Sequence, residues 1–328
     1  MAINIADIKT EYGSYYIDAG QNQARVRQLM RHGMETAAFF TPVNTEDSVY
    51  RMSESKFTKI VQAFQKTFTE KGTTTFIPRP IETFRQKIDV SETPDDLRRS
   101  WLEFLASESL SREEWPFVRW LIESHIIDQI QEDLELDGLF TGVYAAPTPG
   151  TAGDTDKAMT GFRKIINDWV DDETIPAANV INTGALDASD PKLFVGQVID
   201  FVKGVNTKYR NKVNMQLAIS KEYEMHWNQG VLERFNLQNT TMPDGNGYRV
   251  PFAQNVNLLF LPSMGSSEKI VMTERGNALM PMKGMDKMGR FKIEENRRVV
   301  DIMSDWQLGV GFVLPEAVFT NDRDLAAS

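Results

Sequence analysis

Residues 56–90 are the most restrictive feature of the sequence, because they read as one long extended stretch with few ways to pack. The stretch is rich in threonine, isoleucine and phenylalanine, which favour β-strands. Glu70-Lys71-Gly72 interrupts it, and glycine readily adopts the dihedral angles that a tight turn requires. The pattern predicts a long hairpin whose strands are Phe57–Thr69 and Thr73–Val90.

Two prolines, Pro78 and Pro80, lie inside the second predicted strand. Proline has no amide proton to donate to a β-ladder, so this strand must have a free edge or project from a sheet. A two-stranded hairpin is poorly stable alone in water. The hairpin therefore needs another surface to pack on, which is the first indication of a partner subunit.

A long amphipathic helix is predicted from about Trp115 to Leu136, with Gly138 ending it. Ser111–Glu114 matches a capping box just before its start. The apolar face repeats every four residues and consists of Ile122, Ile126, Ile130 and Leu134. The opposite, solvated side consists of Ser124, Asp128, Gln131, Glu132 and Glu135.

The other apolar patterns predict helices and strands that are interleaved without a regular βαβ repeat, which indicates an α+β fold. Further helices are predicted at 97–105, 159–170, 190–210 and 225–235. Residues 212–220 alternate in polarity and predict a strand that is buried on one face. Further strands are predicted at 255–261, 269–273, 291–304 and 306–314.

Charge is distributed unevenly along the chain, whose net charge is −10. Residues 101–200 hold 6 basic and 19 acidic groups, so most of the negative charge lies in the middle. No basic excess of the kind that binds DNA sequence-specifically is present. Three arginines in the helix-like segment 22–40, Arg25, Arg27 and Arg31, either form a solvated basic face or contact the acidic middle region of another copy.

Chemical motifs are scarce. The sequence contains no cysteine, which excludes disulfides, thiolate metal sites and thiol nucleophiles. His32, His125 and His226 are isolated from one another, and no phosphate-binding loop or nucleophile elbow occurs. We therefore expect no catalytic residue, no cofactor and no metal. Five methionines within residues 272–288 fit either a core edge or an interaction surface.

The order of these parts resembles the major capsid proteins of tailed bacteriophages, which have the Hong Kong 97-type fold. WLEFLASESLSREEWPFVRWLIESHIIDQIQEDLELDGLFTGVY, residues 101–144, is similar to the link and long spine helix of the family, in the form found in phages of Bacteroidetes-type hosts. FKIEENRRVVDIMSDWQLGVGFVLPEAVFT, residues 291–320, is similar to the C-terminal strands. The resemblance implies an N-terminal arm at 1–48, an E-loop hairpin at 49–95, a peripheral domain at 96–145 with 292–328, and an axial domain at 146–291.

The resemblance also implies a function: a structural subunit that assembles into hexamers and pentamers of an icosahedral head enclosing double-stranded DNA. It implies a virion component assembled in the host cytoplasm, with a separate scaffolding protein, a portal and decoration or head-completion proteins as partners, and no membrane. An encapsulin-like compartment shell and a two-domain α+β hydrolase are the alternatives. The subunit contacts are expected at Arg25, Arg27, Arg31, Phe64, Phe68, Lys71, Phe76, Asp128, Glu132 and Glu135.

Overall fold

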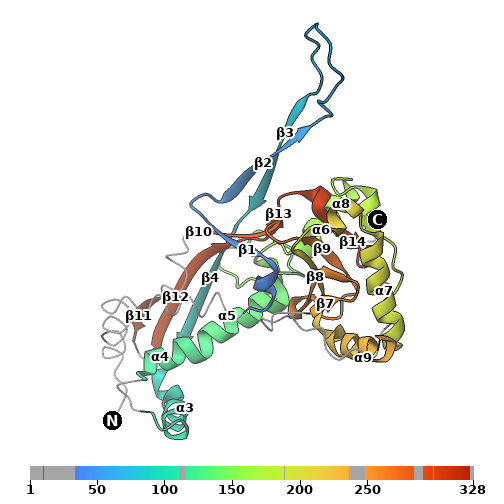
Figure 1. The fold of residues 1–328 in the computed structure, drawn as a ribbon. Helices are drawn as coiled ribbons and strands as arrows, with labels where there is room; N and C mark the ends of the chain where they lie inside the picture. The colour runs from blue at the N-terminus through green and yellow to red at the C-terminus, as the bar shows by residue number, and fades with distance from the viewer. Residues whose placement is uncertain are drawn as a thin grey trace.

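The structure is a computed structural model of the chain. It describes residue 10 and residues 34–110, 115–187, 189–235, 248–283, 291–297 and 299–325. Figure 1 shows three parts: a sheet with a long helix beside it, a lobe of helices around a second sheet, and a hairpin that extends away from both. Among the described residues, no helix has the length and apolar character that crossing a membrane requires.

The first sheet is built on β4 (Phe84–Glu92) and β12 (Val299–Leu308), which pair antiparallel over nine consecutive residues. Every second residue of β12 from Val300 to Leu308 is buried, so one face of the sheet is covered. The buried apolar residues among them belong to the same hydrophobic cluster as the long helix. The sheet is completed by β1 (Thr41–Thr45), β10 (Ala278–Lys283), β11 (Lys292–Asn296) and β13 (Gly311–Phe312).

The predicted long helix is confirmed. It consists of α4 (Phe117–Leu121), a π-helical segment at 122–126, α5 (Ile127–Asp133) and a second π-helical segment at 134–138, which follow one another without a gap. The predicted apolar stripe is buried, and the helix ends at Gly138 as expected. A shorter helix, α3 (Pro94–Ser107), precedes it, and the predicted capping box lies outside the described residues.

The second sheet lies in the helical lobe, which we call the axial lobe (the described residues of 146–274 with 318–321). Helices α7 (Pro191–Gly204) and α9 (Glu224–Phe235) contribute to the hydrophobic cluster on one of its faces. Helix α6 (Phe162–Asp171) contributes to the cluster on the other face, and α8 (Thr207–Arg210) follows α7. The strands are β5 (Val180–Ile181), β6 (Met215–Ser220), β7 (Tyr248–Val250), β8 (Ala253–Leu261), β9 (Val271–Glu274) and β14 (Val318–Asn321).

The predicted hairpin exists, but its strand boundaries are wrong. Strands β2 (Val49–Phe57) and β3 (Thr74–Glu82) pair with each other alone, and residues 58–73 form a long tip. The second predicted strand divides at Thr83, after which β4 joins the first sheet. The division follows from pairing: β4 has a long partner in β12, whereas β3 has only β2.

Two further expectations need correction. Strand β6 is buried at all six positions rather than on one face, because it lies between β8 and β9 with helices on both sides. The C-terminal strands break at Arg297, whose φ is 61°, rather than near residue 305. Strand β14, which belongs to the C-terminal segment, pairs with β9 in the second sheet.

Candidate assembly surface

The root of the hairpin is packed tightly into the body. Ile81 is 5% exposed and lies against Gly311. A β-carbon at Gly309 would come within 2.1 Å of the carbonyl oxygen of Glu82, so only glycine fits at this position. Thr83 donates hydrogen bonds to the Ser48 carbonyl from its N–H at 3.0 Å and its hydroxyl at 2.8 Å. These contacts fix the direction in which the hairpin leaves the body.

The hairpin tip, residues 58–73, is held by local hydrogen bonds, but its large apolar side chains are exposed. The Gln62 and Gln65 side-chain amides donate to the Thr69 carbonyl and hydroxyl at 2.7 and 2.6 Å. The tight turn predicted at Glu70–Gly72 is wrong, because residues 58–73 form one long tip, although Gly72 does have a φ of +100°, which favours glycine. The large apolar side chains of the tip point into solvent: Ile60 is 59% exposed, Val61 85%, Phe64 92% and Phe68 91%.

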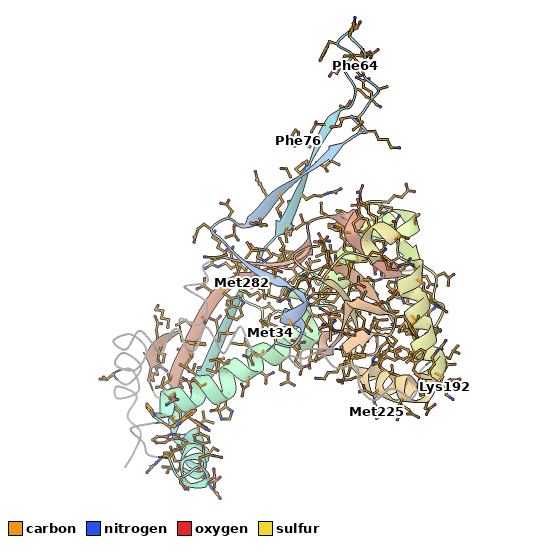
Figure 2. The ribbon with its side chains drawn as sticks, viewed as in Figure 1. Met34, Phe64, Phe76, Lys192, Met225 and Met282 are labelled. Atoms are coloured by element: carbon orange, nitrogen blue, oxygen red, sulfur yellow. The ribbon has the colours of Figure 1, made fainter. Side chains whose placement is uncertain are left out.

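The four hairpin residues that the sequence marks as contacts are all exposed. Phe64 and Phe68 lie in the tip, and Phe76, 68% exposed, lies on β3 below it (Figure 2). The Lys71 ammonium donates a hydrogen bond to the carbonyl of Val61, which ties the two sides of the tip together. Exposed aromatic side chains of this size are rare on a finished surface, since burying each is worth about 1.5–3 kcal/mol. Their role as subunit contacts stays a prediction.

The acidic residues of the long helix fall into two groups. Asp128 and Glu132 are exposed as expected, and no ion pair joins either of them to another described residue. Glu135 is only 8% exposed, so its predicted place on the solvated side is wrong. The π-helical segment 134–138 changes the helical phase at this point and turns Glu135 inward. Arg25, Arg27 and Arg31 lie outside the described residues.

Glu135 belongs to a buried junction that sequence patterns do not reveal. The N–H of Thr36 lies 3.0 Å from Glu135 Oε1, and the Thr36 hydroxyl also donates to this carboxylate. The Ser263 hydroxyl lies 2.8 Å from that of Thr36, so the segment before β1, the long helix and the axial lobe meet here. Burial raises the pKa of Glu135, and the hydrogen bonds from Thr36 oppose this rise.

Lys269 is the one lysine among the largest fully buried side chains of the described residues. Its ammonium donates to Asn167 Oδ1 at 2.8 Å and to the Arg323 carbonyl at 3.1 Å. Asn167 in turn donates to the Asp324 carbonyl at 2.8 Å. Burial lowers the pKa of Lys269 to about 8. These hydrogen bonds are made within the chain, and they hold the C-terminal segment against α6.

Two of the three histidines have aromatic neighbours rather than metal-ligating ones, and His32 lies outside the described residues. His125 lies edge-on to Trp120 with ring centres 4.5 Å apart, and His226 lies near Tyr223. Within the described ranges, no group of three or more histidine, aspartate or glutamate side chains is placed to share a metal ion. A surface depression on α3 is lined by residues of that one helix: Arg98, Arg99, Leu102, Glu103 and Ala106.

The structure shows where three of the five methionines within residues 272–288 lie. Met272, Met280 and Met282 are at most 2% exposed and belong to the core. The remaining two, Met285 and Met288, lie outside the described residues.

No family model matches the chain, and no curated protein matches it in sequence. Solved structures do match over almost its whole length. A chain of the satellite phage P4 procapsid has a TM-score of 0.56 and 11% identity, covering 91% of this chain and 89% of that one. A chain of the cyanophage A-1(L) capsid has a TM-score of 0.50 and 13% identity, covering 87% and 90%. The chain has the fold of phage capsid proteins.

The fold combines helices and sheets, as the sequence predicts, and this chain contributes a projecting hairpin and a long helix to it. A chain of an encapsulin complex from Synechococcus elongatus is also similar, with a TM-score of 0.45 and 10% identity, covering 88% of this chain and 86% of that one. The assignment of residue ranges to an arm, an E-loop, a peripheral and an axial domain stays a prediction.

Proposed function

We propose that the chain is the structural subunit of a tailed-phage head, which assembles into hexamers and pentamers of an icosahedral shell around double-stranded DNA. The observation that carries the proposal is the match to a procapsid chain over 91% of this chain at a TM-score of 0.56. A match of that extent leaves little of the chain to form a separate catalytic domain.

The hairpin supports the proposal on physical grounds. A closed shell of identical subunits needs heterologous contacts, in which one surface of a subunit meets a different surface of the next. The fixed root directs the tip away from its own body (Figure 1), and the large apolar side chains of the tip are mostly exposed to solvent. In the proposed shell the tip lies on a neighbouring copy, where Phe64 and Phe68 become buried.

The net charge of the chain fits a shell protein that encloses DNA better than a protein that binds DNA sequence-specifically. A net charge of −10 gives the shell no general attraction for the phosphate backbone. We propose that it encloses DNA without sequence-specific binding, as part of the virion, after assembly in the cytoplasm of a Bacteroidetes-type host. A separate scaffolding protein, a portal and decoration or head-completion proteins complete the proposed set of partners.

The test is assembly of the purified chain, followed by light scattering and negative-stain electron microscopy. We expect shells, tubes or sheets built of ring-shaped capsomers. A double substitution of the tip, Phe64→Ser with Phe68→Ser, should abolish assembly while leaving a folded subunit. Phe64→Leu with Phe68→Leu is the matched control, because it keeps apolar bulk at both positions and should still assemble.

A chain that stays monomeric or dimeric at high concentration, with and without its scaffolding protein, contradicts the proposal. The encapsulin-like alternative is decided on the same particles after isolation from cells. Nuclease-protected double-stranded DNA inside them supports a phage head, whereas particles that hold protein cargo and no DNA support a compartment shell.

A further inference from the structure

A fully buried lysine lies beneath residues 322–325, which follow β14 and which we call the cover segment. The Lys269 ammonium donates to two uncharged oxygens, Asn167 Oδ1 at 2.8 Å and the Arg323 carbonyl at 3.1 Å. No ion pair joins Lys269 to another described residue. A buried ammonium without an adjacent carboxylate is less stable than one in water, because burial penalises the charged form.

The cover segment is held by contacts that lie near the surface. The Arg323 guanidinium lies 2.7 Å from the Glu268 carboxylate, and both side chains are partly exposed. The Ser267 hydroxyl donates to the carboxylate of Asp324, which is exposed and has a φ of 50°. This left-handed backbone is less favourable for aspartate than for glycine. A segment that is held by a few exposed contacts can open locally while the rest of the protein stays folded.

Lys269 is the group in this cluster that changes its charge near neutral pH. The other charged or titratable groups around it come from α6, from residue 268, from the cover segment and from the turn before α9: Arg163, Asp171, Glu268, Arg323, Asp324 and Tyr223. The carboxylates are ionised and the arginines protonated throughout pH 7–9. Burial raises the pKa of Tyr223 above 10.0, so its hydroxyl stays neutral. The pKa of Lys269, in contrast, is lowered to about 8.

We propose that the cover segment is a pH-sensitive latch on the axial lobe, which opens by local unfolding as Lys269 takes up a proton. Opening brings the lysine into water, where its affinity for protons returns to the ordinary value. A high proton concentration therefore favours the open form, and raising the pH holds the cover segment closed. With a pKa of about 8 in the closed form and 10.5 in the open form, the opening constant should fall about tenfold from pH 7 to pH 9.

Amide hydrogen exchange of dissociated wild-type subunits tests the proposal, so the result does not depend on assembly. The N–H of Thr183 donates to Asp322 Oδ1 at 2.9 Å and should lose its protection when the cover segment opens. The amides of β6 lie inside the sheet and report unfolding of the whole lobe. After correction for the intrinsic exchange rate, Thr183 should be less protected than β6 at pH 7. Its protection should rise about tenfold between pH 7 and pH 9.

A substitution assigns the pH dependence to the lysine. Lys269→Met keeps the length of the side chain and removes the ionisable group, so the tenfold change at Thr183 should disappear. Lys192→Met is the matched control, because Lys192 is exposed on α7, and it should keep the change. If Lys269→Met does not fold, the wild-type pH series still decides. Protection at Thr183 equal to that of β6, no change between pH 7 and pH 9 in the wild type, or a change that survives in a folded Lys269→Met would each overturn the proposal.

Discussion

The hairpin and strand β6 of the axial lobe are opposite uses of β-structure in one chain. All six residues of β6 are buried, including the polar Gln216 and Ser220, between two neighbouring strands and helices on both faces. Among the hairpin side chains that the structure describes, those at the root are buried, whereas Phe64 and Phe68 in the tip are more than 90% exposed. The axial lobe buries its apolar side chains within one chain, whereas the hairpin has a buried root and an exposed apolar tip.

The difference determines where the stabilising contacts of each region are found. Burying a phenylalanine side chain contributes about 1.5–3 kcal/mol, and this contribution is already realised for Phe194 and Phe201 in the axial lobe. For Phe64 and Phe68 it is absent from the isolated subunit. Substitutions in the axial lobe should therefore change folding, and substitutions in the tip should change association.

The largest effect on subunit stability is expected in β6. Leu217 is fully buried, so Leu217→Ala should reduce the free energy of unfolding by about 2–5 kcal/mol through lost burial and a cavity. Phe68→Ala, which removes a larger side chain from the tip, should change it by less than about 0.5 kcal/mol because Phe68 is 91% exposed. Urea unfolding of the dissociated subunits measures both. A comparable loss for Phe68→Ala would show that the tip is part of the folded core.

Sequence patterns predict the long helix better than they predict strand β6. The period of the long helix gives its extent and its buried stripe, because that stripe packs on one sheet and its pattern is local. The alternation in residues 212–220 gives a strand but not its burial on both faces, since Gln216 and Ser220 read as solvent-facing. Whether a polar strand residue is covered depends on β8, β9 and α6, which lie far from it in sequence.

The hairpin shows the same limit in its boundaries. Residues of β3 and β4 have similar strand propensity, so their division at Thr83 has no local signal. It is set by the pairing of β4 with β12, which comes more than 200 residues later in the chain. Similarly, the burial of Glu135 depends on a phase change in the helix and on Thr36, 99 residues away. The exposed contact candidates Phe64, Phe68 and Phe76 could be named from the sequence because aromatic residues in a stretch with little packing are unusual.

A change of intermediate size tests whether the root fixes the hairpin. Gly309→Val places a side chain where a β-carbon alone would come within 2.1 Å of the Glu82 carbonyl, so the root must shift. We expect a loss of about 1–3 kcal/mol in the free energy of unfolding, typical of overpacking. We also expect loss of assembly because the tip is redirected. Gly153→Val is the control, since its β-carbon would meet nothing within 4 Å. Normal assembly of Gly309→Val would mean that the hairpin direction is set elsewhere.

The smallest effect on stability is expected at the buried junction of Glu135, Thr36 and Ser263, and it depends on pH. Because burial raises the pKa of Glu135 above its ordinary value of 4.5, the folded subunit binds a proton in a range where the unfolded chain does not. The free energy of unfolding should therefore rise as pH falls from neutral toward 4.5. Glu135→Gln removes the titrating group while keeping an oxygen that can accept from Thr36. It should leave stability at pH 7 unchanged or slightly higher and flatten this part of the pH dependence. The exposed Glu132→Gln on the same helix should keep the wild-type slope, and a slope that survives in Glu135→Gln would assign the pH dependence to another group.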